Sequence, residues 1–180
     1  MAKVRRRAAT PPATVSRPAL LVKGSDAEFR RLIHDLIAYG HRLDACRDAF
    51  AAIAGISGVQ YEILMRVSRA EAPSVGEVAA QLHRSGAFIT IEATKLVERG
   101  ILEKVADARD GRKVLLRITR KSLALLEQLA PYQQRINDVL FEFLDAKRFR
   151  ALRELAAELV AAGDRAVALT EVLLQEAKAA

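Results

Sequence analysis

Two arginines and two aspartates lie close together in one short segment, Asp107-Ala-Arg-Asp-Gly-Arg112, between two β-prone runs. A guanidinium at the tip of a tight hairpin suits a narrow anionic cleft, because a narrow DNA minor groove has an enhanced negative potential. We expect Arg112 to enter such a groove, and Asp110, two residues earlier, to orient its guanidinium. Asp107 and Arg109 are then placed to brace the hairpin. The alternative is a solvated polar turn that only joins two strands.

A pair of helices is expected directly before this hairpin. The pattern predicts a short helix from Ser74 to Leu82, a turn at His83-Arg84-Ser85, and a longer helix that stops at Gly100. That spacing is typical of a helix-turn-helix, whose second helix enters the DNA major groove with its N-terminal side chains on the base edges. Seven residues are the expected DNA contacts of this segment: Arg84, Ser85, Gly86, Ala87, Phe88, Thr90 and Lys95. The alternative is an ordinary pair of surface helices.

The residue types at these positions predict only modest base readout. Ser85 and Thr90 can hydrogen-bond bases or phosphates, while Ala87 and the Thr90 methyl can touch thymine methyl groups. Arg84 is placed to pair with the DNA backbone, and the helix N-terminus itself favours phosphate. The first turn of this helix lacks Arg, Asn and Gln, the residues that make bidentate contacts to bases.

The elements that must position these residues are short helices followed by one hairpin. Runs 101–105 and 113–118 predict two strands, since side chains in the second run alternate in polarity as in a half-buried strand. Three segments have the capping-box pattern that opens a helix: Ser25–Glu28, Ser57–Gln60 and Ser74–Glu77. Gly55 and Gly100 are placed to end helices, because glycine readily adopts the left-handed conformation of a C-terminal cap.

Longer helices are expected on both sides of this central part. The first begins near Ser25, is about thirty residues long and contains Gly40 as a possible bend. Two more helical patterns run over about residues 120–143 and 145–176. The first helix is longer than a small globule needs for one core helix, so we expect part of it to meet a partner chain.

Charge and composition limit the possible partners. The net charge is +7, and residues 1–24 contain six basic and no acidic side chains, while residues 74–121 contain ten basic and six acidic ones. Positive charge on a tail and on the hairpin region favours a polyanionic partner. The single cysteine, Cys46, excludes a disulfide within the chain and fits a reducing cytoplasm. No signal-peptide pattern or membrane-spanning apolar run is present in the sequence.

The chain resembles the MarR family of bacterial transcriptional regulators in four segments. These are Ile56-Ser-Gly-Val-Gln-Tyr-Glu-Ile-Leu64, Val78-Ala-Ala-Gln-Leu82, Leu96-Val-Glu-Arg-Gly-Ile-Leu102, and Asp107-Ala-Arg-Asp-Gly-Arg112 with the following Val114-Leu-Leu-Arg-Ile-Thr119. The last segment is similar to the wing signature of the family and is the most specific of the four. The resemblance extends over roughly residues 30–178.

This resemblance implies a triangular homodimer with intertwined first and last helices and two winged helix-turn-helix lobes. Such a dimer reads a pseudo-palindromic operator in double-stranded DNA and usually represses nearby genes until a small ligand or oxidation releases it. By the family pattern, Arg112 is the minor-groove residue and Asp110 supports it. Ser85-Gly-Ala-Phe88 stands where the family often has Ser-Arg-Ser/Thr-Thr, a departure that bears on base contacts and not on the fold.

The resemblance also implies an effector pocket between the dimerisation helices and the DNA-binding lobe, often for an aromatic acid. His41, Arg42, Tyr61 and Met65 lie on the segments that would line it, with Arg42 suited to a carboxylate. Core packing and a surface ion pair are the alternative for each of them. Cys46 falls late in the first long helix, unlike the reactive cysteine of the family's peroxide sensors, and is expected to be a small core residue.

The sequence therefore predicts a mainly α fold with a small β-hairpin wing. Four regions are expected: a disordered basic arm (1–24), an N-terminal dimerisation helix (25–56), a winged helix-turn-helix lobe (57–119) and C-terminal dimerisation helices (120–180). We expect a cytoplasmic, homodimeric regulator, most simply a repressor released by a small aromatic or acidic ligand, with no metal or cofactor. A nonspecific architectural DNA-binding protein is the alternative. No nucleophile–base pair, phosphate-binding glycine loop or metal-ligand cluster indicates an enzyme.

Overall fold

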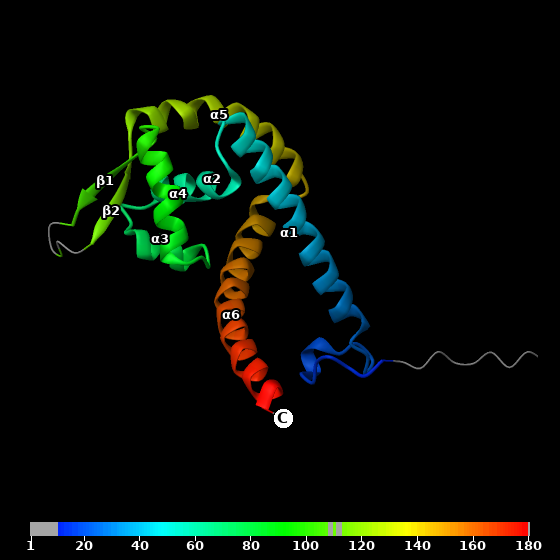
Figure 1. The fold of residues 1–180 in the computed structure, drawn as a ribbon. Coiled ribbons are helices and arrows are strands. Elements are labelled where there is room, and N and C mark those ends of the chain that lie inside the picture. Colours follow the sequence, from blue (N-terminus) through cyan, green and yellow to red (C-terminus); the bar gives the residue numbers. More distant parts are fainter. Residues whose placement is uncertain (1–10, 108–109, 111–112, 180) are drawn as a thin grey trace, which may run out of the picture. The chain divides into compact units, whose positions relative to one another are not determined.

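The computed structural model describes residues 11–107, 110 and 113–179 (Figure 1). The chain divides into two compact units, Met1–Gln133 and Gln134–Ala180. Its elements, in order, are η1 (Pro18–Leu20), α1 (Ala27–Ile53), α2 (Gly58–Arg69), α3 (Val75–Gln81), α4 (Gly86–Glu98), β1 (Leu102–Ala106), β2 (Val114–Ile118), α5 (Arg120–Leu140) and α6 (Ala146–Ala179). The fold is mainly α with one hairpin, as the sequence predicts.

The winged lobe, residues 57–119, contains most of the buried apolar side chains of its compact unit. Helices α2, α3 and α4 pack together, and the hairpin packs beside α3 and α4 (Figure 1). The side chains of Ile63, Leu64, Ile89 and Leu96 are completely buried. Burial of a side chain of this size stabilises a fold by roughly 1.5–3 kcal/mol, so these contacts hold the DNA-binding elements in place.

The hairpin is joined to the start of α3 as well as to itself. β1 and β2 are antiparallel, with Leu102 opposite Ile118 and Val105 opposite Leu115. The backbone N–H of Leu116 donates to the carbonyl of Pro73 at 2.9 Å, which adds a third backbone segment beside β2. The position of the hairpin relative to α3 is therefore set by backbone hydrogen bonds.

The helix starts inside the lobe follow the expected capping patterns. Ser57 accepts from the backbone N–H of Gln60 at 3.2 Å, and the Gln60 side chain accepts from the Ser57 N–H at 3.2 Å. Ser74 and Glu77 form the same reciprocal pair. The stops at Gly55 and Gly100 are also confirmed, since their φ angles are +64° and +68°.

The predicted capping box at Ser25 is wrong. The helix begins at Ala27, and Asp26 occupies the N-cap position without a side-chain capping hydrogen bond. Ser25 instead pairs with Val22 through two backbone hydrogen bonds of 2.9 and 3.0 Å, so its backbone serves a turn before the helix. The carboxylate of Asp26 accepts hydrogen bonds from Thr14 and forms an ion pair with Arg30. Neither interaction can be predicted from residues 25–28 alone.

Residues 11–24 differ from the expected disordered arm. They contain the 3₁₀ helix η1, and Thr14 donates to Asp26 through its backbone N–H at 2.8 Å and its hydroxyl at 2.9 Å. Asp26 is only 2% exposed. This buried carboxylate therefore ties a segment twelve positions earlier to the start of α1. The first ten residues of the expected arm lie outside the described part of the chain.

The C-terminal unit contains the end of α5 and the 34-residue helix α6. Asp145 accepts from the backbone N–H of Arg148 at 2.8 Å, a capping contact in the first turn of α6. No side chain of α6 is buried in the part of the chain that the structure describes. In that same part, no helix is both long and apolar enough to span a bilayer.

Candidate nucleic-acid interface

Helix α4 has a buried face and an exposed face. Ser85 caps it by accepting from the backbone N–H of Phe88 at 3.2 Å, as the sequence predicts. Ile89, Ala93 and Leu96 follow at spacings of four and three residues and are completely buried. Since these side chains anchor one face of α4 in the lobe, the opposite face is held toward solvent in a fixed orientation.

The structure brings the expected contact residues of this segment together. Seven exposed residues lie on the turn before α4 and along its outer face: Arg84, Ser85, Gly86, Ala87, Phe88, Thr90 and Lys95. Lys95 is not a free cation, because its ammonium donates to the Glu92 carboxylate at 2.6 Å. The capping bond uses one of the two lone pairs of the Ser85 hydroxyl, so this bond does not prevent the hydroxyl from donating its proton to DNA.

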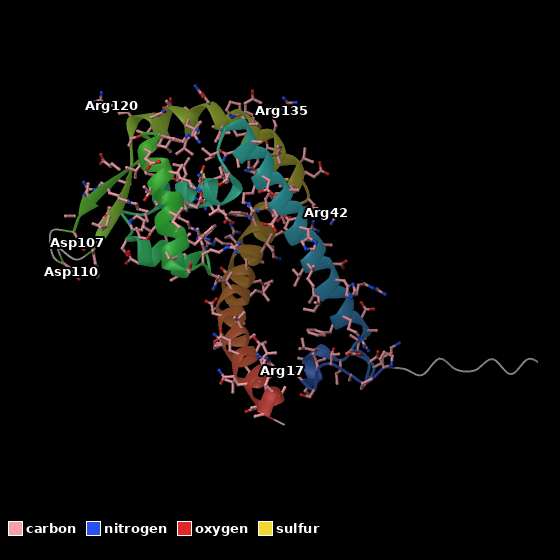
Figure 2. All side chains as sticks on the ribbon, in the orientation of Figure 1. Arg17, Arg42, Asp107, Asp110, Arg120 and Arg135 are labelled. Carbon is pink, nitrogen blue, oxygen red and sulfur yellow. The ribbon has the colours of Figure 1, made fainter. Side chains whose placement is uncertain are left out.

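The wing is described at its strands and at Asp107 and Asp110. The backbone N–H of Asp107 donates to the Lys113 carbonyl at 3.1 Å, and the N–H of Lys113 donates to the Asp110 carbonyl at 2.8 Å. Figure 2 shows both aspartates at the outer end of the hairpin and Arg120 at its base. The two expected wing arginines, Arg109 and Arg112, lie outside the described residues.

A groove of about 410 Å³ lies between α3, α4 and the hairpin. Its lining consists of Ser74, Val75, Gly76, Thr90, Lys104, Lys113 and Val114. Lys104 donates to the Thr94 hydroxyl at 2.8 Å, which holds its ammonium beside the outer face of α4. Sequence reasoning did not name Lys104 or Lys113 as contacts. The strand alternation was the available signal, but it does not say which strand face lies beside a helix.

A buried polar network lies behind the exposed face of α4. Glu92 is 8% exposed, and its two carboxylate oxygens accept from Gln60 at 2.9 Å and from Lys95 at 2.6 Å. The hydrogen bond from Lys95 lowers the pKa of the Glu92 carboxyl, burial acts in the opposite direction, and the Gln60 bond adds to the lowering. The network fixes the middle of α4 to the first turn of α2, and sequence reasoning missed it.

The four residues of the expected effector pocket have separate environments. Tyr61 is buried, its hydroxyl accepts from Gln133 at 2.6 Å, and its ring lies 6.0 Å from that of Phe50. Burial raises the pKa of the Tyr61 phenol, against the effects of the Gln133 hydrogen bond and of nearby Arg69. Arg42 is exposed on α1 (Figure 2) and donates to the Ala38 carbonyl at 2.6 Å on its own helix.

His41 is exposed and Met65 is partly exposed. Among the described residues, no hydrogen bond or ion pair joins any two of His41, Arg42, Tyr61 and Met65, so the effector pocket stays a prediction. Cys46 is a partly exposed free thiol on α1. No group of three metal-ligating side chains is present among the residues that the structure describes.

An anchored helix-turn-helix with a hairpin behind it defines the class of winged helix-turn-helix folds. Comparison with protein families narrows this class, because residues 54–113 match the model of the MarR family. The matched segment includes α3, α4 and β1, which contribute to the groove and provide the exposed face of α4. The lobe is therefore similar to the MarR family over residues 54–113, and the resemblance seen in the sequence is confirmed there. Proteins of this family are transcriptional regulators and not enzymes.

Solved structures support the fold over most of the chain. Apo MarR from E. coli shares 23% identity and a TM-score of 0.56, over 72% of this chain and 94% of that protein. A MarR protein from Peptoclostridium difficile shares 20% identity and a TM-score of 0.61, over 81% and 93%. The transcriptional regulator BldR from Sulfolobus solfataricus shares 17% identity and a TM-score of 0.59, over 74% and 96%. Curated protein sequences give no significant match.

Proposed function

We propose that the chain is a homodimeric DNA-binding transcriptional regulator that represses genes near its operator. The observation that carries this proposal is the exposed face of α4, which is anchored from behind and flanked by the cations Arg84, Lys104 and Lys113. A rigid helix with positive charge beside it suits the major groove, where phosphates line both edges. Residues 1–10 add Lys3 and Arg5-Arg-Arg7, which would strengthen the attraction to phosphate.

Homodimerisation is supported by apolar surface on the long helices. Leu32, Leu36 and Ile37 on α1 are 51%, 42% and 55% exposed. Helix α6 repeats apolar side chains at alternating spacings of three and four residues. These are Leu152, Leu155, Leu159, Ala162, Ala166, Leu169 and Leu173, and the leucines among them are 40–56% exposed. This spacing is that of a coiled-coil seam, which a second copy of the chain would cover.

A hollow of about 670 Å³ adds to the apolar surface of the C-terminal unit. Phe141, Leu144, Phe149 and Leu152 contribute to its lining. In a two-fold dimer, two α4 helices would reach successive major grooves about one helical turn, ~34 Å, apart. That arrangement explains why a pseudo-palindromic operator is the expected target.

Release by a small aromatic or acidic ligand completes the proposal. It rests on the expected pocket residues, of which exposed Arg42 has the charge that would attract a carboxylate. The single thiol, Cys46, fits action in a reducing cytoplasm. Nonspecific architectural binding is the second candidate, and one observation favours it. The exposed face of α4 lacks Arg, Asn and Gln over its first two turns, so it lacks bidentate base contacts there.

The proposal is tested by selecting duplexes from a random-sequence pool with the full chain and measuring affinity at physiological salt. Arg112→Ala is expected to weaken binding by roughly tenfold, since one groove-inserted guanidinium is lost. Arg150→Ala is the matched control, because it removes the same charge from the exposed surface of α6. Circular dichroism and sedimentation verify that both variants fold and assemble.

Two results would count against the proposal. Unchanged affinity in Arg112→Ala contradicts the wing assignment. Binding without any enriched sequence favours the architectural candidate over the regulator.

A further inference from the structure

The outer face of α4 exposes two large apolar side chains, and Val114 at the nearby groove is the other exposed one among the described residues of the lobe. Phe88 is 39% exposed and Ile91 is 55% exposed, whereas Ile89 and Leu96 on the same helix are completely buried. Ala87 is exposed beside them. Leaving an isoleucine and a phenylalanine in water forgoes burial that the lobe achieves elsewhere. The exposed patch therefore indicates a surface that these side chains meet in function.

The threonines of this face present methyl groups and not hydroxyls. Thr90 donates its hydroxyl to the Gly86 carbonyl at 2.7 Å, and Thr94 donates its hydroxyl to the Thr90 carbonyl at 2.7 Å. A hydroxyl has a single proton, so neither threonine retains a donor for a base acceptor. The Thr94 oxygen also accepts from Lys104 at 2.8 Å. With both hydroxyl protons donated within the protein, the methyl groups are the apolar parts that these threonines present to an external ligand.

The charge around this patch identifies the kind of surface it fits. Arg84, Lys104 and Lys113 are exposed at its margins, on the turn before α4 and on the hairpin. An apolar patch that binds another protein does not need surrounding cations. A DNA groove, in contrast, presents base edges between two rows of negatively charged phosphates. Apolar side chains inside a cationic rim thus match a DNA major groove.

We propose that α4 reads thymine through its C5-methyl group, with Phe88, Ile91 and the Thr90 methyl forming the contact surface. The C5-methyl is the apolar group that the major groove displays, and it distinguishes T·A pairs without any hydrogen bond. This inference rests on the proposed function and names what the recognition helix recognises. It also gives a helix that lacks bidentate residues a way to supply the sequence preference that the proposed function requires.

The first test removes the methyl group from the DNA. The probe is a duplex that the full chain enriches from a random pool, compared with the same duplex carrying deoxyuridine for thymine within both half-sites. Base pairing is kept and only the methyl is lost. Each lost contact is expected to weaken binding about fourfold, as for one buried methylene, so two symmetric contacts give about fifteenfold. Deoxyuridine confined to the flanks is the control and is expected to leave affinity unchanged.

The second test uses two variants of one threonine. Thr90→Val keeps a methyl and removes the hydroxyl, and is expected to bind the thymine duplex as the unaltered chain does. Thr90→Ser keeps the hydroxyl and removes the methyl, and is expected to bind about fourfold more weakly. All three residue types have similar helix propensity, so the helix itself is little changed. Phe88→Ala and Ile91→Ala are expected to weaken binding and to reduce the discrimination against deoxyuridine.

The outcomes separate this inference from the proposed function. Equal affinity for the two duplexes, or weakening by Thr90→Val and not by Thr90→Ser, overturns the methyl readout while DNA binding stands. A shift in oligomeric state without a change in DNA affinity in Phe88→Ala also overturns it, because the patch then serves a protein contact. Absence of sequence enrichment overturns it as well. Failure to bind any duplex overturns the inference and the proposed function together.

Discussion

The winged lobe and helix α6 use the same residue types in opposite ways. Leu64 and Leu96 in the lobe are completely buried, whereas Leu159 and Leu173 on α6 are 55% and 51% exposed. All four lie on well-formed helices, so local conformation does not explain the contrast. The lobe builds most of its core from its own helices and hairpin, and Phe50 on α1 and Leu129 on α5 are buried in the same compact unit. The leucines of α6 follow an amphipathic spacing and are exposed in the described part of the chain, which is why we propose a second copy as their partner.

A pair of leucine truncations gives the largest expected effect and tests this contrast directly. Leu64→Ala removes a completely buried side chain and is expected to lower the free energy of unfolding of the lobe by about 2–5 kcal/mol. Leu159→Ala is the same change on α6 and is expected to act on the monomer–dimer equilibrium instead. Urea unfolding and sedimentation equilibrium, each over a range of protein concentrations, measure the two effects.

The contrast would fail under two outcomes. A Leu159→Ala chain with unaltered assembly would remove α6 from the proposed dimer interface. A Leu64→Ala chain that unfolds like the unaltered protein would mean that the lobe core contributes less than its burial indicates.

A smaller effect is expected from the buried network behind α4. Gln60→Leu leaves a Glu92 carboxylate oxygen without its partner inside the lobe, and is expected to cost about 1–3 kcal/mol of unfolding free energy. Leucine also removes the side-chain half of the Ser57 cap. Ser57→Ala, which removes the other half and leaves Glu92 paired, serves as the control for the capping contribution.

The pH dependence of this network has a definite sign. Because hydrogen bonding from Lys95 lowers the pKa of Glu92 in the folded chain, the carboxylate adds stability above its ordinary pKa of 4.5. That stability is lost as pH falls through the lower folded value. The stability difference between the unaltered chain and Glu92→Gln should therefore be full at neutral pH and decline in acid. A difference that grows in acid would contradict this assignment.

The smallest and most local effect concerns the tie between Thr14 and Asp26. The backbone N–H of Thr14 lowers the pKa of Asp26, burial opposes it, and the Thr14 hydroxyl and Arg30 add to the lowering. The tie should persist at neutral pH and be lost as pH falls below the ordinary aspartate value of 3.8. Amide hydrogen exchange at Thr14 measures it. Asp26→Asn should raise that exchange at neutral pH while the lobe amides stay protected.

Local patterns were enough to predict most element starts and stops. Three of these signals are the cap at Ser57, the cap at Ser74 and the helix end at Gly100. Each depends only on residues within a few positions, so it is visible in the local sequence. The helix start at Ser25 was mispredicted because the Asp26 side chain accepts a hydrogen bond from Thr14, twelve positions earlier. Local pattern therefore failed where a long-range contact competed with it.

The exposed residues of the candidate site could be predicted from the sequence, but the buried contacts that hold α4 in place could not. The exposed residues from Arg84 to Thr90 could be named because helix periodicity shows which side is free. The Gln60–Glu92 bond joins positions 32 apart, and no spacing rule connects them. The use of the Thr90 hydroxyl was equally hidden, because it depends on a rotamer choice between backbone and ligand.

The two capping boxes of the lobe differ at their third helical residue, and the difference has a consequence for sequence variation. Glu77 accepts from Ser74 on an exposed surface, whereas Gln60 must accept from Ser57 and donate to Glu92 inside the lobe. Glutamate at position 60 would keep the cap and set two carboxylates against each other, while lysine would pair with Glu92 and lose the cap. Positions 60 and 92 should therefore covary among relatives, with glutamate at 60 appearing where 92 is no longer acidic.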